Sequence, residues 1–512
     1  MNNLVPLYVI GGYLVLLLGL GLVSHHFFRG TSSDYFVASR SIGPFMLLMS
    51  VFGTTMTAFA LVGSTGKAYG SGIGVYGLMA SWSGLIHSAC FFLVGVRLWA
   101  IGKRHGFVTQ CQFFRERFES PAFGYLLFPV LVALIVPYLL IGLLGAGAVM
   151  RGLTVNMFPE AFASTRGAIP AWLTGLVICG VVLTYVFFGG VRSTAWANTF
   201  QTLVFMVTGV IAFFMIARAL GGLNEASELV KENSPQHLAR EGMIGRWQFF
   251  SYLFVPLSVG MFPHLFQHWL TARSAKTFRA TLILHPICIM IVWVPCILIG
   301  VWAVGNGLTL PPGLNANAIL SITVKKLVQS PFLSGLLTAG ILAAIMSSLD
   351  SQFMCLGTMF SNDIAVRVFG AGRFSDRQKL WLGRIFVVLV VASTYGLSLV
   401  STSHIFDLAV WCFSGFGALF PIVFAAVYWR RTTAAGAMTA LLVTVGIWIY
   451  LFMLSGFGGE YLLFTDWLPG EDGIMPVAVM TLACAVSLVL VSLLTQPPDQ
   501  KTLARFFPGQ GP

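Results

Sequence analysis

The sequence predicts an all-α protein that crosses a lipid bilayer about thirteen times, and three observations support this fold class. Of its 512 residues, 57% are hydrophobic and only 9% are charged, whereas about 25% of the residues in a globular domain are charged. The apolar residues form successive runs of roughly the 20 residues that a helix needs to span the hydrocarbon core. The weak ten-residue alternation of a membrane barrel is absent. The bilayer is therefore the main solvent of this chain.

Each apolar run is expected to form one helix, and the connections between runs are too short for a soluble domain. We number the expected helices from 0 to 12 in chain order. Their ranges are 3–26, 42–65, 74–100, 122–150, 168–188, 194–217, 247–268, 279–304, 331–360, 380–400, 404–429, 434–455 and 475–496. The first run is longer than the apolar segment of a signal peptide and has no preceding Lys or Arg, so it is expected to be retained.

The basic residues are divided unequally between the two sides of the membrane. The chain has 29 Lys and Arg residues and a net charge of +12. With thirteen alternating helices, 20 of these 29 residues fall on one side. Because positively charged loops stay in the cytoplasm, we expect an inner-membrane protein with its N-terminus outside and its C-terminus in the cytoplasm. The charge reflects topology and does not indicate a nucleic-acid partner.

Two expected helices contain residues that interrupt a membrane helix. Helix 1 has Gly53 in front of several hydroxyl side chains, and helix 6 contains Pro256, Gly260 and Pro263. Backbone groups freed by a break must be satisfied by protein or by a watery cavity. Broken helices at matching positions of two inverted halves form the midplane binding sites of transporters. The spacing of five helices fits such a repeat, although Gly and Pro are also frequent in membrane helices generally.

This spacing divides the chain into five parts. They are an extra N-terminal helix at 3–26, a first inverted repeat at 42–217, a second at 247–429, two C-terminal helices at 434–496 and a cytoplasmic tail at 497–512.

Helix 8 carries the only acidic side chain deep in an expected span, Asp350. A carboxylate at the bilayer centre costs at least about 2.5–3.5 kcal/mol to insert, so it is a candidate functional residue. Alternatively, Asp350 only forms a structural hydrogen bond. One turn earlier, Ser347 and Ser348 offer adjacent hydroxyls. Sodium is a hard cation that prefers oxygen ligands, and these hydroxyls could bind it together with freed carbonyls. Paired serines also occur as small packing residues.

The remaining chemistry-bearing residues show no pattern typical of an enzyme. The eight Cys and nine His residues lack the spacing of a disulfide framework or a zinc site. Single His residues in apolar runs, such as His87 and His285, are expected to be hydrogen-bonded packing residues. We therefore expect neither catalysis nor an organic cofactor.

Four motifs, in order along the chain, resemble those of the sodium:solute symporter family. They are residues 34–44 before helix 1, residues 188–192 with Trp196 and Gln201 before helix 5, residues 343–352 with Asp363 and Ile364 in helix 8, and residues 419–421 with 428–431 in helix 10. The resemblance covers about residues 5–455. It implies a LeuT-type five-plus-five inverted repeat behind an extra N-terminal helix. It also implies sodium-coupled alternating access for solutes such as sugars, proline, pantothenate, monocarboxylates, iodide or urea.

The resemblance further implies a sodium site. In the family, two carbonyls of helix 1 bind the ion together with one carbonyl and two hydroxyls of helix 8. Matched motif to motif, these ligands fall on Gly53, Met56, Ala344, Ser347 and Ser348. Gly53 stands where Ala is common, a change expected to be harmless if the carbonyl is the ligand.

A second cation site is less clear from the sequence. Some family members use an Asp in helix 5 where this chain has Asn198. Two interpretations stay open. Either Asp350 replaces that carboxylate, so that Asn198, Asp350 and Ser351 form the site, or the site is absent and one sodium accompanies each solute.

The solute is expected to bind between the broken parts of helices 1 and 6. The candidate residues are Thr55, Thr57, Tyr138, Tyr252, Phe413 and Ser414, although each aromatic side chain could equally be a packing residue. Thr55 replaces the Asp found in proline carriers, which argues against an amino acid that needs a partner for its ammonium group. Residues 59–70 and 261–264 look nearer to the pantothenate and monocarboxylate branches, so a small carboxylate is expected.

Together these features predict a monomeric carrier that uses Na⁺ as coupling ion to bring a small organic solute across the lipid bilayer. Two alternatives stay open: a proton-coupled carrier that uses Asp350, and a membrane sensor that binds solute without transporting it.

Overall fold

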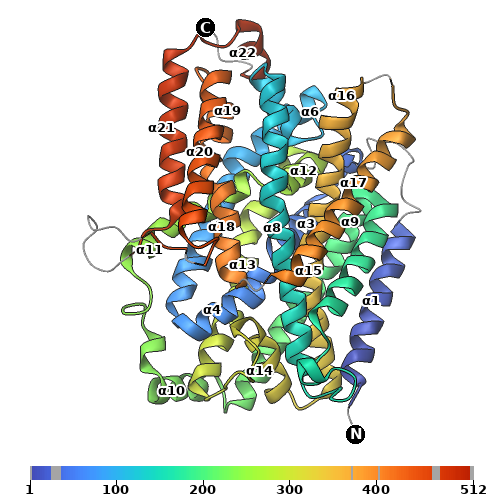
Figure 1. Ribbon diagram of the computed structural model, residues 1–512, viewed down its shortest axis with the longest axis vertical. Coiled ribbons are helices and arrows are strands. Elements are labelled where there is room, and N and C mark those ends of the chain that lie inside the picture. The colour runs from blue at the N-terminus through green and yellow to red at the C-terminus, as the bar shows by residue number, and fades with distance from the viewer. Residues whose placement is uncertain are drawn as a thin grey trace.

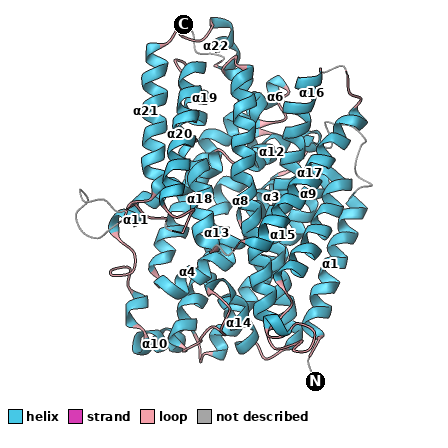
Figure 2. Ribbon diagram, viewed as in Figure 1, coloured by secondary structure: helices cyan, strands magenta, loops and turns pink. Residues whose placement is uncertain are grey.

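The computed structural model describes residues 3–24, 36–370, 373–401, 404–459, 461–463 and 473–507. In these ranges the chain is helical, with two isolated bridges and no strand (Figure 2). The all-α fold class predicted from the apolar runs is therefore confirmed. Asp34 and Tyr35 of the first motif and residues 508–512 of the tail lie outside the described residues.

The expected spans all correspond to helices. Among the described residues, nine helices are long and apolar enough to cross a membrane, and two bent helix pairs also qualify. The spans are α1 (Val5–Ser24), α3 with α4 (Pro44–Thr55 and Ser64–Ser71), a helix containing α5 and α6 (Trp82–Cys90 and Val96–His105), α8 (Pro121–Thr154), α9 (Ala171–Ala219), α11 with α12 (Arg246–Ser251 and Pro263–Thr271), α13 (Phe278–Gly305), α15 (Pro331–Met359), α17 (Asp376–Val400), α18 with α19 (Ile405–Ala418 and Phe420–Tyr428), α20 (Ala434–Leu454) and α21 (Pro476–Leu494).

Helix α9 holds two of the expected spans, helices 4 and 5. It runs over 49 residues and changes direction at Gly190, whose φ of 64° and ψ of −165° are not helical. Only glycine adopts that combination readily. Once α9 is counted as two spans and α1 is added, all thirteen expected helices are present.

Shorter helices lie between the spans. They are α7 (Gln110–Arg117), α10 (Leu223–Asn233), α14 (Ile319–Leu327), α16 (Val366–Phe369) and α22 (Gln500–Phe506). The two described ends of the chain lie at opposite ends of the molecule, as an odd number of crossings requires (Figure 1).

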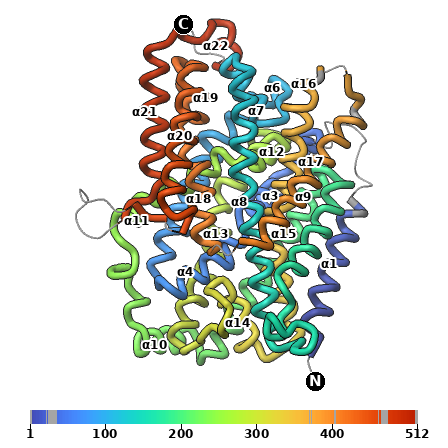
Figure 3. The backbone as a smooth tube through the Cα atoms, in the orientation of Figure 1, coloured from blue at the N-terminus to red at the C-terminus, as the bar shows by residue number. Residues whose placement is uncertain are grey.

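Helix α15 occupies the centre of the bundle. In its most apolar stretch 83% of the residues are buried, compared with 28% for α17 and for α20. It packs against α9, α1, α8 and α3, whereas α20 and α21 pair with each other along one edge (Figure 3). Residues that α15 shares with α3 and α9 are therefore shielded from lipid by protein. The boundaries predicted for the two inverted repeats stay a prediction.

Candidate cation and solute site

Both predicted helix breaks are present. Helix α3 ends at Thr55, the next residue Met56 has φ −90° and ψ 89°, and the chain resumes helical structure at Phe59 with a bend of 58°. The second break separates Gly260 from Pro263 with a bend of 51°. The last carbonyls of a helix lack intrahelical partners, so the end of α3 presents free oxygen atoms inside the protein.

Helix α15 meets the broken end of α3 at the predicted cation residues. The Ser347 hydroxyl lies 2.8 Å from the Gly53 carbonyl and 2.9 Å from the Ala344 carbonyl, within hydrogen-bonding distance of both. All three residues are buried. The Ser348 hydroxyl instead donates to the Ile345 carbonyl of its own helix at 2.9 Å. The structure thus brings Gly53, Ala344 and Ser347 together as a cluster of neutral oxygen atoms, the ligand type that suits a hard monovalent ion.

Gly53 is also constrained by its neighbour on α9. A Cβ atom at this position would lie 2.2 Å from Thr202 Oγ1, and that hydroxyl donates to the Met49 carbonyl at 3.0 Å. An alanine at this position would therefore require Thr202 to move. The expectation that glycine in place of alanine leaves the carbonyl ligand unaffected stays a prediction.

The three residues considered for a second cation lie in contact with one another. The Tyr185 hydroxyl donates to Asp350 Oδ2 at 2.9 Å, and the Ser351 hydroxyl lies 3.1 Å from Oδ1. With its side-chain nitrogen turned toward Asp350, Asn198 is 2.9 Å from both carboxylate oxygens. Ser351 also lies 3.0 Å from His268 Nε2. Asp350 is completely buried, and Asn198 stands beside it.

A small cavity lies between the two broken helices. Four of the predicted solute residues line it: Thr55, Tyr138, Tyr252 and Phe413. The cavity also has walls that the sequence analysis did not assign to it, namely Phe59, Ser83, His87, Val255, Pro256, Ser258, Val259, Phe262 and Trp293. None of these lining side chains is Asp, Glu, Lys or Arg.

The other two predicted solute residues do not line this cavity. Thr57 is buried, and its hydroxyl accepts a hydrogen bond from the Phe59 N–H at 3.0 Å, so it caps the second half of the broken helix. Ser414 is also buried, on α18 next to Phe413.

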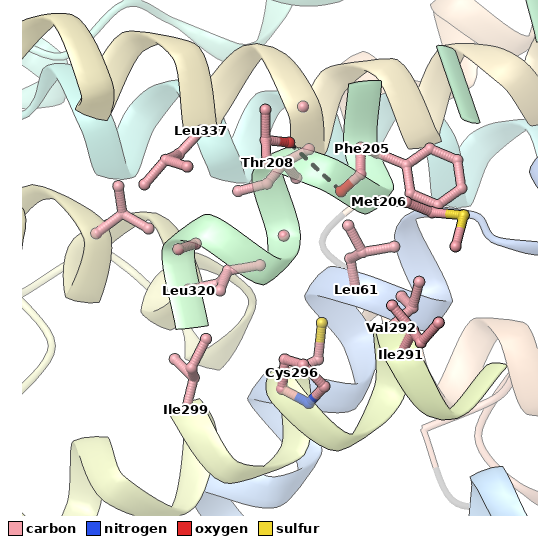
Figure 4. Close-up of a pocket in the computed structure, with 16 residues that line it drawn as sticks. Leu61, Phe205, Met206, Thr208, Ile291, Val292, Cys296, Ile299, Leu320 and Leu337 are labelled. Atoms are coloured by element: carbon pink, nitrogen blue, oxygen red, sulfur yellow. Dashed lines mark hydrogen bonds between the residues drawn. The ribbon is translucent and has the colours of Figure 1, made fainter. Parts of the chain in front are cut away.

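A second small cavity lies between α9, α13, α14 and α15 (Figure 4). Its walls are mostly aliphatic and include Leu61, Ile299, Leu320 and Leu337. The one hydroxyl on it, from Thr208, turns back to the carbonyls of Val204 (2.8 Å) and Phe205 (3.4 Å) on its own helix. This cavity offers no group for a cation or a polar solute.

Sequence comparison finds relatives over nearly the whole chain. The sodium/proline symporter of Haemophilus influenzae is 26% identical, with 96% of this chain and 95% of that protein covered. The sodium/proline symporter of Escherichia coli is 25% identical over 91% and 92% of the two chains. An osmoregulated proline transporter of Bacillus subtilis is 24% identical over 95% and 94%.

Structure comparison finds the same architecture. The substrate-bound, outward-open structure of a Na⁺-coupled sialic acid symporter superimposes with a TM-score of 0.73 at 19% sequence identity, covering 98% of this chain and all of the other. The LeuT-type fold expected from the motifs is thus confirmed.

The family model supplies the remaining comparison. The model of the sodium:solute symporter family matches residues 35–444, which include both broken helices and all of the candidate ligands. This protein is a multi-pass membrane transporter that belongs to the sodium:solute symporter family.

Proposed function

We propose that this protein carries a small carboxylate into the cell together with sodium, by alternating access. The contact between Ser347 on α15 and the Gly53 carbonyl at the end of α3 is the observation that carries the proposal. It joins the central helix to the broken helix through oxygen atoms alone. Sodium bound by Gly53, Met56, Ala344, Ser347 and Ser348 would strengthen that junction, and sodium release would free α3 to move.

The membrane potential gives the cycle its direction. We propose that the N-terminus faces the outside and the C-terminus the cytoplasm, as the distribution of basic loops predicts. Moving one positive charge inward is then favoured by about 2.3 kcal/mol for each 100 mV of negative internal potential. Sodium would therefore enter with the solute and leave on the cytoplasmic side.

The lining of the cavity between the broken helices favours a carboxylate as the solute, such as a monocarboxylate or pantothenate. Thr55 lines the cavity where proline carriers have an acidic residue, and no lining residue carries a carboxylate that could pair with an ammonium group. Proline is the second candidate, because the relatives described above carry that solute in their names. Proline also has a carboxylate group, so both candidate solutes would present the same group to the site.

Asp350 supports the proton as an alternative coupling ion. It is a buried carboxyl group, and its hydrogen-bond partners Tyr185, Asn198 and Ser351 are all uncharged. A proton-coupled carrier would use this group, and its uptake would follow pH and ignore sodium. A non-transporting sensor would bind solute in sodium without accumulating it in vesicles.

The deciding experiment measures the thermal stability of the purified protein in matched sodium, potassium and choline chloride. A ligand that binds only the folded state raises its stability, so we expect a rise specific to sodium. Ser347→Ala should reduce that rise at the same sodium concentration. Ser361→Ala is the matched control, because Ser361 is buried at the far end of the same span and donates to the Lys379 carbonyl at 2.7 Å. An equal melting temperature in all three salts would contradict sodium coupling.

A further inference from the structure

Two nitrogen heterocycles in the wall of the solute cavity have buried polar atoms without a partner. His87 belongs to α5 and Trp293 to α13, and both line the cavity. They are 7% and 3% exposed. Within the part of the chain that the structure describes, neither His87 Nδ1 nor Trp293 Nε1 forms a hydrogen bond. Buried polar groups are nearly always paired in folded proteins, and these two atoms belong to residues in the cavity wall, so they are candidates to pair with a solute bound there.

The chemistry of the indole group determines what that ligand must offer. Trp Nε1–H can only donate a hydrogen bond, whereas His Nδ1 can donate or accept according to its tautomer. An ammonium group has no acceptor to offer and cannot accept a hydrogen bond from the indole N–H. A carboxylate has two oxygens and can accept from both rings at once. Hydrogen bonds to a charged acceptor are stronger than those to a neutral one.

A third heterocycle, His285, holds this wall in place. Its Nε2 lies 3.2 Å from Thr55 Oγ1, and the Thr55 hydroxyl donates to the Phe52 carbonyl at 2.8 Å. Thr55 therefore accepts from His285, whose proton is on Nε2. The His285 ring meets Phe52 and Phe91 edge-on at centroid distances of 5.4 and 4.9 Å, and it lies 5.4 Å from the His87 ring. His285 does not line the cavity, so it is a positioning residue.

We propose that Trp293 and His87 bind the carboxylate end of the solute and determine the specificity of the transporter for small carboxylates. The inference rests on the proposed sodium-coupled symport and assigns to it two residues on helices outside the broken pair. The opposite walls, which include Tyr138, Val259 and Phe413, are left to contact the apolar part of the solute.

The test uses the full-length protein in detergent, with sodium present throughout. Stability is titrated with propionate, L-lactate and L-proline, and with pyrrolidine and ethanol, which lack the carboxyl groups of L-proline and L-lactate. We expect at least one acid to raise the melting temperature and its counterpart without the carboxyl group to have no effect. A response to L-proline alone would assign the site to the amino acid, and a response to propionate or L-lactate would assign it to a monocarboxylate.

Trp293→Phe keeps an aromatic ring and removes the N–H group. It should weaken binding of the acid about 10- to 100-fold, as expected for one lost hydrogen bond to a charged group. Trp269→Phe is the matched control. Trp269 is 1% exposed and its Nε1 also lacks a partner, but it lies on α12 and does not line the cavity. Its change should leave the affinity for the acid within twofold of the parent value.

The histidine is tested in the same way. His87→Leu should weaken binding of the acid, and His87→Asn, which retains a polar group near the position of Nδ1, should restore part of it. The stabilisation by sodium alone reports on folding and on the cation site in every variant. Unchanged affinity in Trp293→Phe, or acid binding that fails while the sodium effect persists, would overturn this inference and leave sodium coupling intact. Loss of the sodium effect in the parent protein would instead contradict the proposed function.

Discussion

Two groups of polar side chains flank the broken helix α3 and differ in how fully they are hydrogen-bonded: Ser347, Ser348 and Asp350 on one side, and His87 and Trp293 on the other. On the α15 side, the hydroxyls of Ser347 and Ser348 have protein partners, and Asp350 contacts three side chains. On the α5 and α13 side, His87 and Trp293 keep unpaired atoms in the wall of a cavity. Both sides are buried, so exposure to water does not explain the difference.

Because of this difference, mutations on the two sides should affect different properties of the protein. Where the protein pairs its own polar groups, removing one group leaves others buried and unpaired, and stability falls. Where polar atoms are unpaired already, removing one costs little stability and mainly affects a ligand. Changes on the α15 side should therefore alter folding and cation binding, and changes on the α13 side should alter solute binding.

The largest effect is expected for Asp350→Ala. The carboxylate is the shared acceptor of Tyr185, Asn198 and Ser351, and each buried donor left unpaired costs about 1–3 kcal/mol. The free energy of unfolding should fall by about 3 kcal/mol or more, measured by titrating the detergent-purified protein with SDS. Asp350→Asn keeps one acceptor oxygen and should lose less. Equal stability of the two variants would show that the network does not act as a unit.

A smaller loss of stability is expected for Gly53→Ala. The added Cβ would meet Thr202 Oγ1 at 2.2 Å, and overpacking of this kind costs about 1–3 kcal/mol. Thr202→Ala removes the opposing hydroxyl, so the double variant should recover most of the loss. The four proteins form a double-mutant cycle in SDS unfolding. Strictly additive effects would mean that the two residues do not oppose each other.

The sequence predicts the fold well because apolar length alone identifies a membrane helix, and each of the thirteen runs is helical in the described residues. It also locates the two breaks, which lie just after Thr55 and just before Pro263, since a helix interruption is unfavourable in lipid and has to be encoded by the chain. The proposed roles of His87 and Trp293 could not be predicted from the sequence in this way. Both lie in apolar runs, and only the packing of α5 and α13 decides which face of each helix lines the cavity.

Thr57 illustrates the same limit inside a motif. Its hydroxyl lies two residues from that of Thr55, and the sequence gives both the same candidate role. The bend of the backbone separates them, because it turns Thr57 to the Phe59 N–H and Thr55 to the cavity.

The paired serines should differ in their effect on sodium. Ser347 contacts the Gly53 carbonyl of another helix, whereas Ser348 contacts only the Ile345 carbonyl of its own. Ser347→Ala should therefore raise the sodium concentration needed for half-maximal stabilisation by about tenfold, equivalent to about 1.4 kcal/mol, and Ser348→Ala should raise it less. Sodium titrations of the melting temperature give both values. A larger effect in Ser348→Ala would place the ion on the other face of α15.

Thr55→Val should have the smallest effect on stability. It should also distinguish most clearly between solute binding on the α13 side and cation binding on the α15 side. Valine keeps the shape of threonine but leaves His285 Nε2 without its acceptor at 3.2 Å, so His285 loses a contact that orients the cavity wall. The apparent KM for the solute in sodium-driven uptake by proteoliposomes should rise about 3- to 10-fold, which corresponds to a loss of about 1 kcal/mol for one hydrogen bond. The sodium dependence should stay the same.

Thr57→Val is the control, because losing the cap on the Phe59 N–H should cost about 1 kcal/mol of stability without changing KM. If the Thr57 variant raised KM as much as the Thr55 variant, the break itself, and not the wall that Thr55 shares with His285, would determine solute affinity.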